Sequence, residues 1–192
     1  MTMQKGFASP SALTKLRIAS WAPLREAAAS AAIVALLAQI VIPLKPIPVT
    51  GQTLAVVLVG LLAHHKSAAG GLAIYASLAA LGAPILSGGT SGIGASFGFV
   101  LGFIAAAYTV SRLTAKGLHG WRAIAIPAIG LAIPYLPGLI WLGGFLASNG
   151  MFSFSTLLTA GVTPFLIGDA IKLAIASSFA LLIADKSPES AA

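Results

Sequence analysis

The chain has 192 residues, of which 58% are hydrophobic and 8% are charged, and its formal net charge is +7 at pH 7. Soluble domains carry about a quarter charged residues, and the four acidic residues here are too few for a water-facing surface, so the composition argues against a soluble protein. The basic residues lie between apolar runs and form no basic stripe, which argues against a nucleic-acid partner.

The first 26 residues are polar to mixed in character and contain no continuous apolar run of the signal-peptide type. We expect them to form a cytosolic N-terminal segment. Residues 27–184 then make one membrane domain, because no repeat, low-complexity tract or linker interrupts them. Residues 185–192 are expected to form a cytosolic C-terminal tail.

Six apolar segments of the membrane domain are candidates for transmembrane helices. A helix rises about 1.5 Å per residue and the hydrocarbon layer is about 30 Å thick, so a span needs about 20 mostly apolar residues. The predicted spans cover residues 27–44, 52–63, 67–81, 95–110, 123–147 and from 165 to just before Asp185. The sequence therefore predicts an all-α polytopic membrane protein, whose second helix is short unless the residues before it also enter the membrane.

The positions of Lys and Arg predict how these spans are oriented, because cytoplasmic loops collect basic residues. With the N-terminus inside, the inner side receives Lys5, Lys15, Arg17, Arg25, Lys66, Arg112, Lys116, Arg122 and Lys186. The outer side receives only Lys45, and Lys172 lies within a span. This distribution predicts both termini in the cytosol and a multi-pass protein of the plasma (inner) membrane.

The two outer connections, residues 82–94 and 148–163, are long and unlike ordinary polar loops. Irregular backbone survives at membrane depth only where protein or a water-filled cavity satisfies its hydrogen-bonding groups. We therefore expect these loops to fold partly over a ligand pocket.

Asp169 and Lys172 are the outstanding candidates for a binding site. Ionisable groups within a span are costly, and they usually face a cavity or one another. Their spacing places both on one helical face, with about 5–6 Å between Cβ atoms. They are predicted to address a polar ligand, and the alternative is an ion pair that only fixes helix packing.

Other candidate ligand contacts lie at the outer ends of spans. Gln52 can donate and accept hydrogen bonds at once, although the residues around it equally fit a simple helix start. Thr90 and Ser91 belong to a glycine-rich run that offers a weak anion seat. The aromatic residues Phe99, Tyr135 and Trp141 line either an apolar pocket or the membrane interface.

Small residues recur along two of the predicted helices. The series Gly94, Gly98, Gly102 and Ala106 indicates a close helix contact. The series Ala27, Ala31 and Ala35 fits either packing within this chain or docking of a partner membrane protein, and the sequence leaves both open.

Motifs for catalysis are missing from the sequence. It contains no phosphate loop, no hydrolase or zinc-protease motif and no Cys, and the three His residues have no acidic or thiol neighbours that would complete a metal site. We therefore expect no catalytic residue, no metal and no cofactor.

Taken together, the motifs resemble the biotin-specific substrate-binding (S) components of energy-coupling-factor (ECF) transporters, the BioY family. The resemblance covers residues 27–184 and rests on four motifs: Pro-Ile-Pro-Val-Thr-Gly-Gln-Thr at 46–53, Gly-Ala-Pro at 82–84 with Gly88 and Gly89, Tyr135 and Gly138 ahead of Trp141 and Leu142, and Pro-Phe-Leu-Ile-Gly-Asp at 164–169 with Lys172. The family usually has Leu, Tyr and Pro where this chain has Gly51, Phe99 and Ile167.

The resemblance implies a six-helix component that captures biotin at its outer face and has no ATPase of its own. Its partners would be biotin, membrane lipid, an ECF transmembrane coupling protein and ATPase subunits. Asp169 would accept from the ureido N–H groups, Lys172 would meet the carboxylate or keep Asp169 ionised, and aromatic residues would cover the rings. The alternatives are uptake of another small vitamin, a membrane enzyme using Asp169 as a base, and a purely structural membrane subunit.

Overall fold

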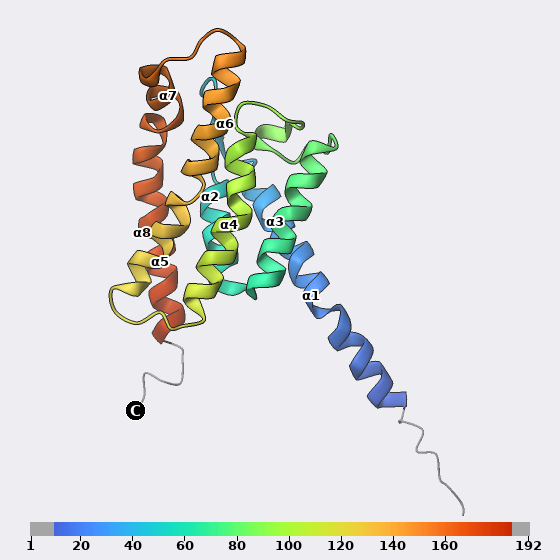
Figure 1. The fold of residues 1–192 in the computed structure, drawn as a ribbon. Coiled ribbons are helices and arrows are strands. Elements are labelled where there is room, and N and C mark those ends of the chain that lie inside the picture. Colours follow the sequence, from blue (N-terminus) through green and yellow to red (C-terminus); the bar gives the residue numbers. More distant parts are fainter. Residues whose placement is uncertain (1–9, 186–192) are drawn as a thin grey trace, which may run out of the picture.

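A computed structural model describes residues 10–185 as a bundle of helices, with side chains described from residue 21 onward (Figure 1). Residues 1–9 and 186–192, which include Lys5, Lys186 and nearly all of the predicted C-terminal tail, lie outside the described residues. The helices are α1 (Pro10–Leu37), α2 (Gln52–Leu62), α3 (His65–Ala80), α4 (Phe97–Thr114), α5 (Arg122–Ala132), α6 (Tyr135–Ser148), α7 (Phe154–Gly161) and α8 (Leu166–Asp185). The strands β1 (Val41–Ile42) and β2 (Val49–Thr50) form a hairpin, and two 3-10 turns, η1 (Ser87–Gly89) and η2 (Thr163–Phe165), complete the structure.

Among the described residues, the buried hydrophobic side chains form three clusters, and the largest of them, here called the main core, joins α1, α2, α3 and α4. α1 packs on α3, α3 on α4, α4 on both α2 and α6, and α5 on α8. Tyr75 and Leu72 of α3 and Val56 of α2 are among the largest fully buried side chains at the centre of this core. Burial of such large apolar groups contributes about 1.5–3 kcal/mol each relative to exposure in water, a figure that is smaller where the alternative surroundings are lipid.

The close contact predicted for the glycine series is confirmed at Gly98 and Gly102 of α4, and its partner is α6, whereas Gly94 precedes α4 and a Cβ atom there would meet nothing within 4 Å. A Cβ atom added at Gly98 would collide with Trp141, and one added at Gly102 would lie 2.7 Å from the Cα of Pro134. Ala106 of the same series is fully buried. Small residues at these positions therefore let two helix backbones approach closely.

The first helix differs from its predicted bounds at both ends. It begins at Pro10, within the expected N-terminal segment, where proline suits the first position of a helix, and it continues past Pro23. It ends at Leu37 and not at residue 44, because the chain soon reaches Pro43, Pro46 and Pro48, which cannot donate helix hydrogen bonds. Residues 41–42 and 49–50 instead pair in an antiparallel hairpin, with Val41 opposite Thr50.

The predicted fifth helix is broken into α5 and α6. The N-cap of α6 is Pro134, and another proline, Pro137, lies in its first turn. Neither residue has an N–H group to donate to the preceding helical turn, so the hydrogen-bond ladder is interrupted between Ala132 and Tyr135.

The second outer connection, residues 148–163, contains the short helix α7 instead of being irregular throughout. The Ser153 side chain begins this helix by accepting a hydrogen bond of 3.0 Å from the backbone N–H of Thr156. Ser at such a position satisfies a backbone donor that the first helical turn leaves free.

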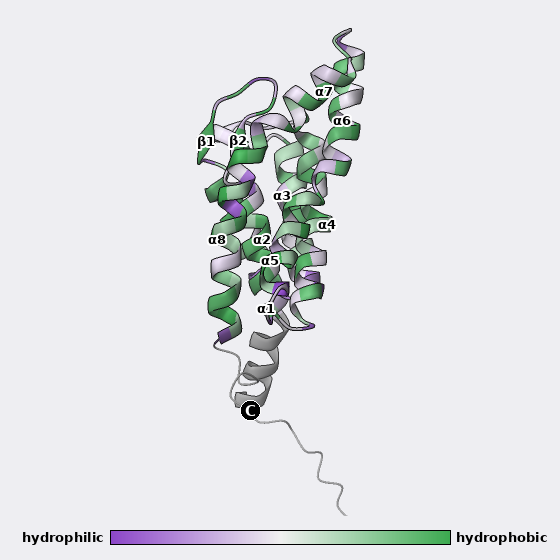
Figure 2. Cartoon of the chain, turned by 90° about the vertical axis from the view of Figure 1, so that its left-hand side faces the viewer, coloured by the Kyte–Doolittle hydropathy of each residue, from purple (hydrophilic) through white to green (hydrophobic). Residues whose placement is uncertain are grey.

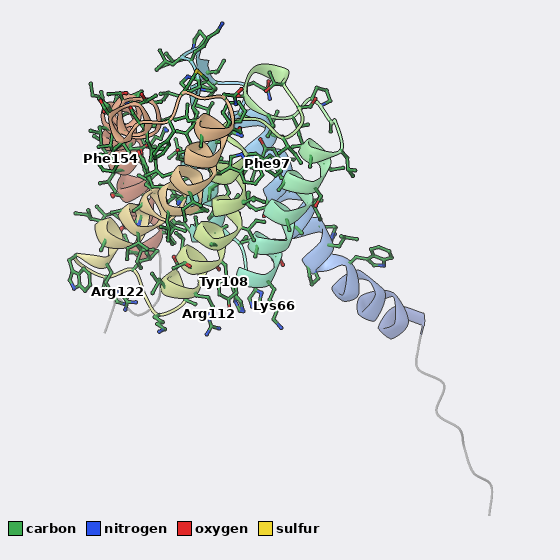
Figure 3. All side chains as sticks on the ribbon, turned by 45° about the horizontal axis from the view of Figure 1, so that its top comes forward. Lys66, Phe97, Tyr108, Arg112, Arg122 and Phe154 are labelled. Carbon is green, nitrogen blue, oxygen red and sulfur yellow. The ribbon has the colours of Figure 1, made fainter. Side chains whose placement is uncertain are left out.

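The two ends of the bundle differ in character. The hairpin of β1 and β2 and the helix α7 lie at one end, here called the hairpin end, opposite the end at which α8 finishes (Figures 1 and 2). Lys66, Arg112 and Arg122 lie together at that opposite end, here called the basic end, far from Phe154 of α7 (Figure 3). Lys45, in the β1–β2 connection, belongs to the hairpin end.

Between these ends the helices present hydrophobic residues along most of their length (Figure 2). Within the described part of the chain, three helical stretches are long and apolar enough to cross a membrane: Phe97–Thr114, Arg122–Ser148 and Phe154–Asp185. α2 is apolar but shorter. The prediction of a helical membrane protein is therefore supported by the length and composition of these helices.

Candidate functional site

A cavity opens in the half of the bundle nearer the hairpin end, where α2, α4, the α5–α6 break and the start of α8 meet. Its empty volume is about 570 Å³ including its mouth. Pockets for small molecules usually measure about 300–1,000 Å³ and combine an apolar wall with a few polar groups. The lining residues are Ile47, Pro48, Thr50, Gln52, Thr53, Leu86, Ser87, Ser96, Phe99, Val100, Phe103, Leu131, Pro134, Tyr135, Phe165, Asp169 and Lys172.

Asp169 and Lys172 form an ion pair on the first turns of α8. The Lys172 Nζ atom lies 3.1 Å from Asp169 Oδ1, and the side chains are only 10% and 17% exposed for Lys172 and Asp169 respectively. The carboxylate also benefits from its place near the helix N-terminus, where backbone N–H groups favour negative charge. The two residues therefore share one helical face, as their spacing predicts, and pair with each other, while their role toward a ligand stays a prediction.

Two neighbours complete the coordination of this pair. The Tyr135 hydroxyl donates to Asp169 Oδ2 at 2.6 Å, and Lys172 Nζ donates to Thr53 Oγ1 at 2.9 Å. Hydrogen bonds to charged groups are about twice as strong as those between neutral groups. The four residues therefore tie α2, α6 and α8 together around one polar centre of the cavity.

A second polar group enters the cavity from the start of α2. Gln52 is 7% exposed, its Nε2 donates to the Tyr75 hydroxyl, and its Oε1 accepts from Thr50 Oγ1 at 2.8 Å. The Tyr75 hydroxyl in turn donates to the carbonyl oxygen of Ile85 at 3.0 Å. Through Tyr75, Gln52 thus links the cavity to the buried face of α3 and to the outer connection, residues 82–94, that follows α3.

An aromatic wall faces these polar groups. The ring of Phe99 lies 6.0 Å from that of Tyr135 and 5.9 Å from that of Phe165, measured between centroids. A Cβ atom added at Gly138 would lie 2.5 Å from the Phe99 ring, so the absence of a side chain at this position makes room for the ring. The wall is suited to an apolar ring system.

Five of the predicted contact residues line the cavity together: Gln52, Phe99, Tyr135, Asp169 and Lys172. The other three lie outside its lining. Thr90 is exposed and donates to the Ser87 carbonyl at 2.9 Å, and Ser91 is also exposed. Trp141 donates to the Gly94 carbonyl at 3.0 Å. The binding role of all eight residues stays a prediction.

The alanine series predicted for partner docking packs within this chain in the structure. Ala27 is 6% exposed, and the carbonyl oxygen of Ala27 would clash with a Cβ atom at Gly71 of α3. Ala31 and Ala35 are partly buried against the main core. The exposed side of α1 carries Ala28, Ala29, Ala32, Ile33 and Leu36 instead. Docking through the predicted series stays a prediction, while the packing alternative is what the structure displays.

Several lining residues were missing from the predicted contacts. Thr53 and Phe165 belong to the motifs at 46–53 and 164–169. Their closeness in sequence to Gln52 and Asp169 is the signal that could have indicated a place in the cavity. Ser87 and Ser96 reach the cavity from irregular connections, where no helical spacing indicates which way a side chain points.

The cavity combines an aromatic wall with a few polar side chains. Among residues 10–185, no group of three His, Cys, Asp or Glu side chains is placed to hold a metal ion. Asp169 is held by two donors, the Tyr135 hydroxyl and Lys172 Nζ. The arrangement suits a small molecule with an apolar ring and several polar groups.

Comparisons with a family model and with individual relatives both indicate the same family. The model of the BioY family matches residues 13–189. A biotin transporter of Lactococcus lactis subsp. cremoris is 34% identical over 161 residues, covering 81% of this chain and 86% of the relative. A probable biotin transporter of Pyrococcus horikoshii is 33% identical over 139 residues, covering 72% of this chain and 82% of the relative.

The fold is also similar to that of a solved structure. The crystal structure at 2.1 Å of the S-component for biotin from an ECF-type ABC transporter matches with a TM-score of 0.69. The match covers 94% of this chain and 96% of that chain, at 20% sequence identity. At this identity the likeness speaks for the fold, and the family model and the relatives carry the assignment: the chain belongs to the BioY family.

Proposed function

We propose that this protein captures biotin and serves its uptake through the membrane as the substrate-binding component of an ECF-type transporter. The observation that carries the proposal is the Asp169–Lys172 pair, which is held by Tyr135 and Thr53 inside a cavity with an aromatic wall. Intramembrane ionisable groups usually mark a substrate pathway. Relatives named as biotin transporters support biotin as the ligand.

The chemistry of biotin complements this cavity. Its ureido group offers two N–H donors and a carbonyl acceptor, which suit Asp169 and Lys172 respectively. Its bicyclic ring suits the wall of Phe99, Phe165 and Tyr135. Its carboxylate, at the opposite end of the molecule from the ureido group, would remain near the mouth, where the backbone of the glycine-rich connection can receive it.

We further propose six transmembrane helices in a multi-pass protein of the plasma (inner) membrane. They are α1, α2, α3, α4, the broken pair α5–α6, and α8, with the basic end in the cytosol. The basic residues at that end support this orientation, since cytoplasmic ends collect Lys and Arg. The same assignment makes residues 27–184 the membrane domain, with cytosolic segments on either side.

Energised uptake by such a component requires partners, because the sequence carries no phosphate loop. We propose an ECF transmembrane coupling protein and ATPase subunits as these partners, with membrane lipid around the remaining helix surface.

Equilibrium binding to the purified protein tests the proposal against its alternatives. Presented with an equimolar mixture of vitamins, the protein should retain biotin and return it chemically unchanged. Retention of another vitamin would indicate a different uptake substrate, product formation would indicate an enzyme, and retention of none would indicate a structural subunit. The relatives are named as transporters, so the transport reading is favoured.

A further inference from the structure

Tyr75 is a fully buried residue of α3 that does not line the cavity and yet bonds to a residue that does. Its hydroxyl donates to the Ile85 carbonyl oxygen at 3.0 Å. The same hydroxyl accepts from Gln52 Nε2 at 2.5 Å. A tyrosine hydroxyl has one proton, so the bond to Ile85 determines what Tyr75 can offer to Gln52.

The side-chain amide of Gln52 is held in one orientation by this arrangement. The carbonyl oxygen of Ile85 can only accept, so the proton of Tyr75 is committed to it. Tyr75 therefore presents a lone pair to Gln52, which selects the NH₂ end of the amide over its oxygen.

Thr50 is compatible with this orientation and stabilises it from the other side. Its Oγ1 accepts from the backbone N–H of Gln52 at 3.2 Å, which leaves the Thr50 proton free to donate. That proton goes to Gln52 Oε1 at 2.8 Å. The two ends of an amide are nearly identical in shape, so hydrogen bonds decide between its two orientations. Here Tyr75 decides the orientation, and the bond from Thr50 stabilises it.

One amide hydrogen and one lone pair of Gln52 are then left for a ligand in the cavity. We infer that Tyr75 is a positioning residue, which fixes the Gln52 amide in one donor–acceptor orientation and so sets the polar match between the cavity and biotin. The inference rests on the proposed function, because it takes biotin as the occupant of this cavity.

Removing the Tyr75 hydroxyl while keeping its ring separates positioning from packing. Tyr75→Phe still fills the core, but it leaves the NH₂ end of Gln52 without its acceptor, so the amide can turn. If Tyr75 acts by positioning, its effect on biotin binding passes through Gln52. If it acts by packing alone, the effect does not depend on which side chain stands at position 52.

A double-mutant cycle on the purified full-length protein tests this difference. The dissociation constant for biotin is measured for the parent, Tyr75→Phe, Gln52→Leu and the double variant, with Tyr108→Phe as the control at a half-exposed tyrosine of α4 that does not line the cavity. Tyr75→Phe should weaken binding by about five- to twentyfold in the parent and less than about twofold in Gln52→Leu. Tyr108→Phe should leave binding unchanged.

Equal weakening in both backgrounds, or none in the parent, would overturn the inference while leaving the proposed function intact. Absence of biotin binding by the parent would instead overturn the proposed function. If Tyr75→Phe did not fold, the same cycle is measured with Thr50→Val, which removes the hydrogen bond at the other end of the amide. Thr50→Ser keeps the hydroxyl and is the control for this variant. Equal effects of Thr50→Val in both backgrounds would then overturn the inference.

Discussion

The Tyr135 hydroxyl donates to Oδ2 of Asp169 at 2.6 Å, which joins the first residue of α6 to the first turn of α8. Lys172 binds the other carboxylate oxygen, so both oxygens have a donor and the carboxylate plane is fixed. The interruption of the helix at Pro134 puts Tyr135 beside the cavity. The proline break therefore positions the tyrosine that binds the Asp169–Lys172 pair.

Tyr135→Phe tests whether this bond orients the carboxylate for a ligand. The variant keeps the ring in the aromatic wall and removes one charge-assisted hydrogen bond, which is worth about 1.5–3 kcal/mol. Because Lys172 still compensates the charge, we expect biotin binding to weaken by about three- to tenfold, measured by titration calorimetry. Parent-like affinity would show that the Tyr135 hydroxyl plays no part in binding.

Gly138→Ala tests whether the room beneath the Phe99 ring sets the size of the cavity. The added Cβ atom would lie 2.5 Å from ring atoms, so the ring must move. Overpacking of this kind costs about 1–3 kcal/mol, so biotin should bind about tenfold more weakly. The double variant Gly138→Ala with Phe99→Leu should recover part of the loss.

The matched control for this substitution lies on the same helix. A Cβ atom added at Gly144 meets nothing within 4 Å, so Gly144→Ala should bind biotin like the parent. Equal weakening by both glycine substitutions would indicate a general effect on α6 and would contradict a specific role of Gly138.

The proposed orientation is open to labelling in intact cells. A Cys introduced at Ser91, near the hairpin end, should react with an impermeant thiol reagent. A Cys introduced at Lys116, between α4 and α5 at the basic end, should react only after the membrane is permeabilised. The chain has no native Cys, so the background is low. The reverse pattern of labelling would invert the topology.

Ala31→Leu separates the two roles considered for the alanine series of α1. Ala31 packs against the main core, so a larger side chain should lower the thermal unfolding temperature of the isolated protein. Ala32→Leu, on the exposed side of the same helix, should change it little. If Ala31→Leu kept parental stability but failed to assemble with the ECF partners, docking and not internal packing would explain the series.

Much of this arrangement could be predicted from the sequence, because the relevant signals are local and periodic. The spacing of Asp169 and Lys172 fixes a shared helical face, and the four-residue repeat of Gly98 and Gly102 fixes a close helix contact. Hydrophobic runs located the helices, since a membrane span requires a continuous apolar stretch.

Other features depend on contacts between distant parts of the chain and escaped prediction. The hairpin after α1 results from several prolines acting together, and no single residue marks its register. Ser87 and Ser96 enter the cavity from irregular backbone. Trp141 is of a residue type that is common in ligand pockets. It packs against Gly98 of α4 and contacts Gly94 and Phe97, and it does not line the cavity.

The most direct test of the account is the biotin dissociation constant of Asp169→Asn and Lys172→Met, measured at equilibrium on purified protein together with thermal stability. Asn keeps the shape of Asp169 and one acceptor oxygen, so its effect reports lost charge more than lost packing. The bond alone is worth about 1.5–3 kcal/mol, so Asp169→Asn should weaken binding by about 10- to 100-fold. If both variants bound biotin like the parent and only unfolded at lower temperature, the pair would be a structural ion pair, and the assignment of this cavity as the biotin site would be wrong.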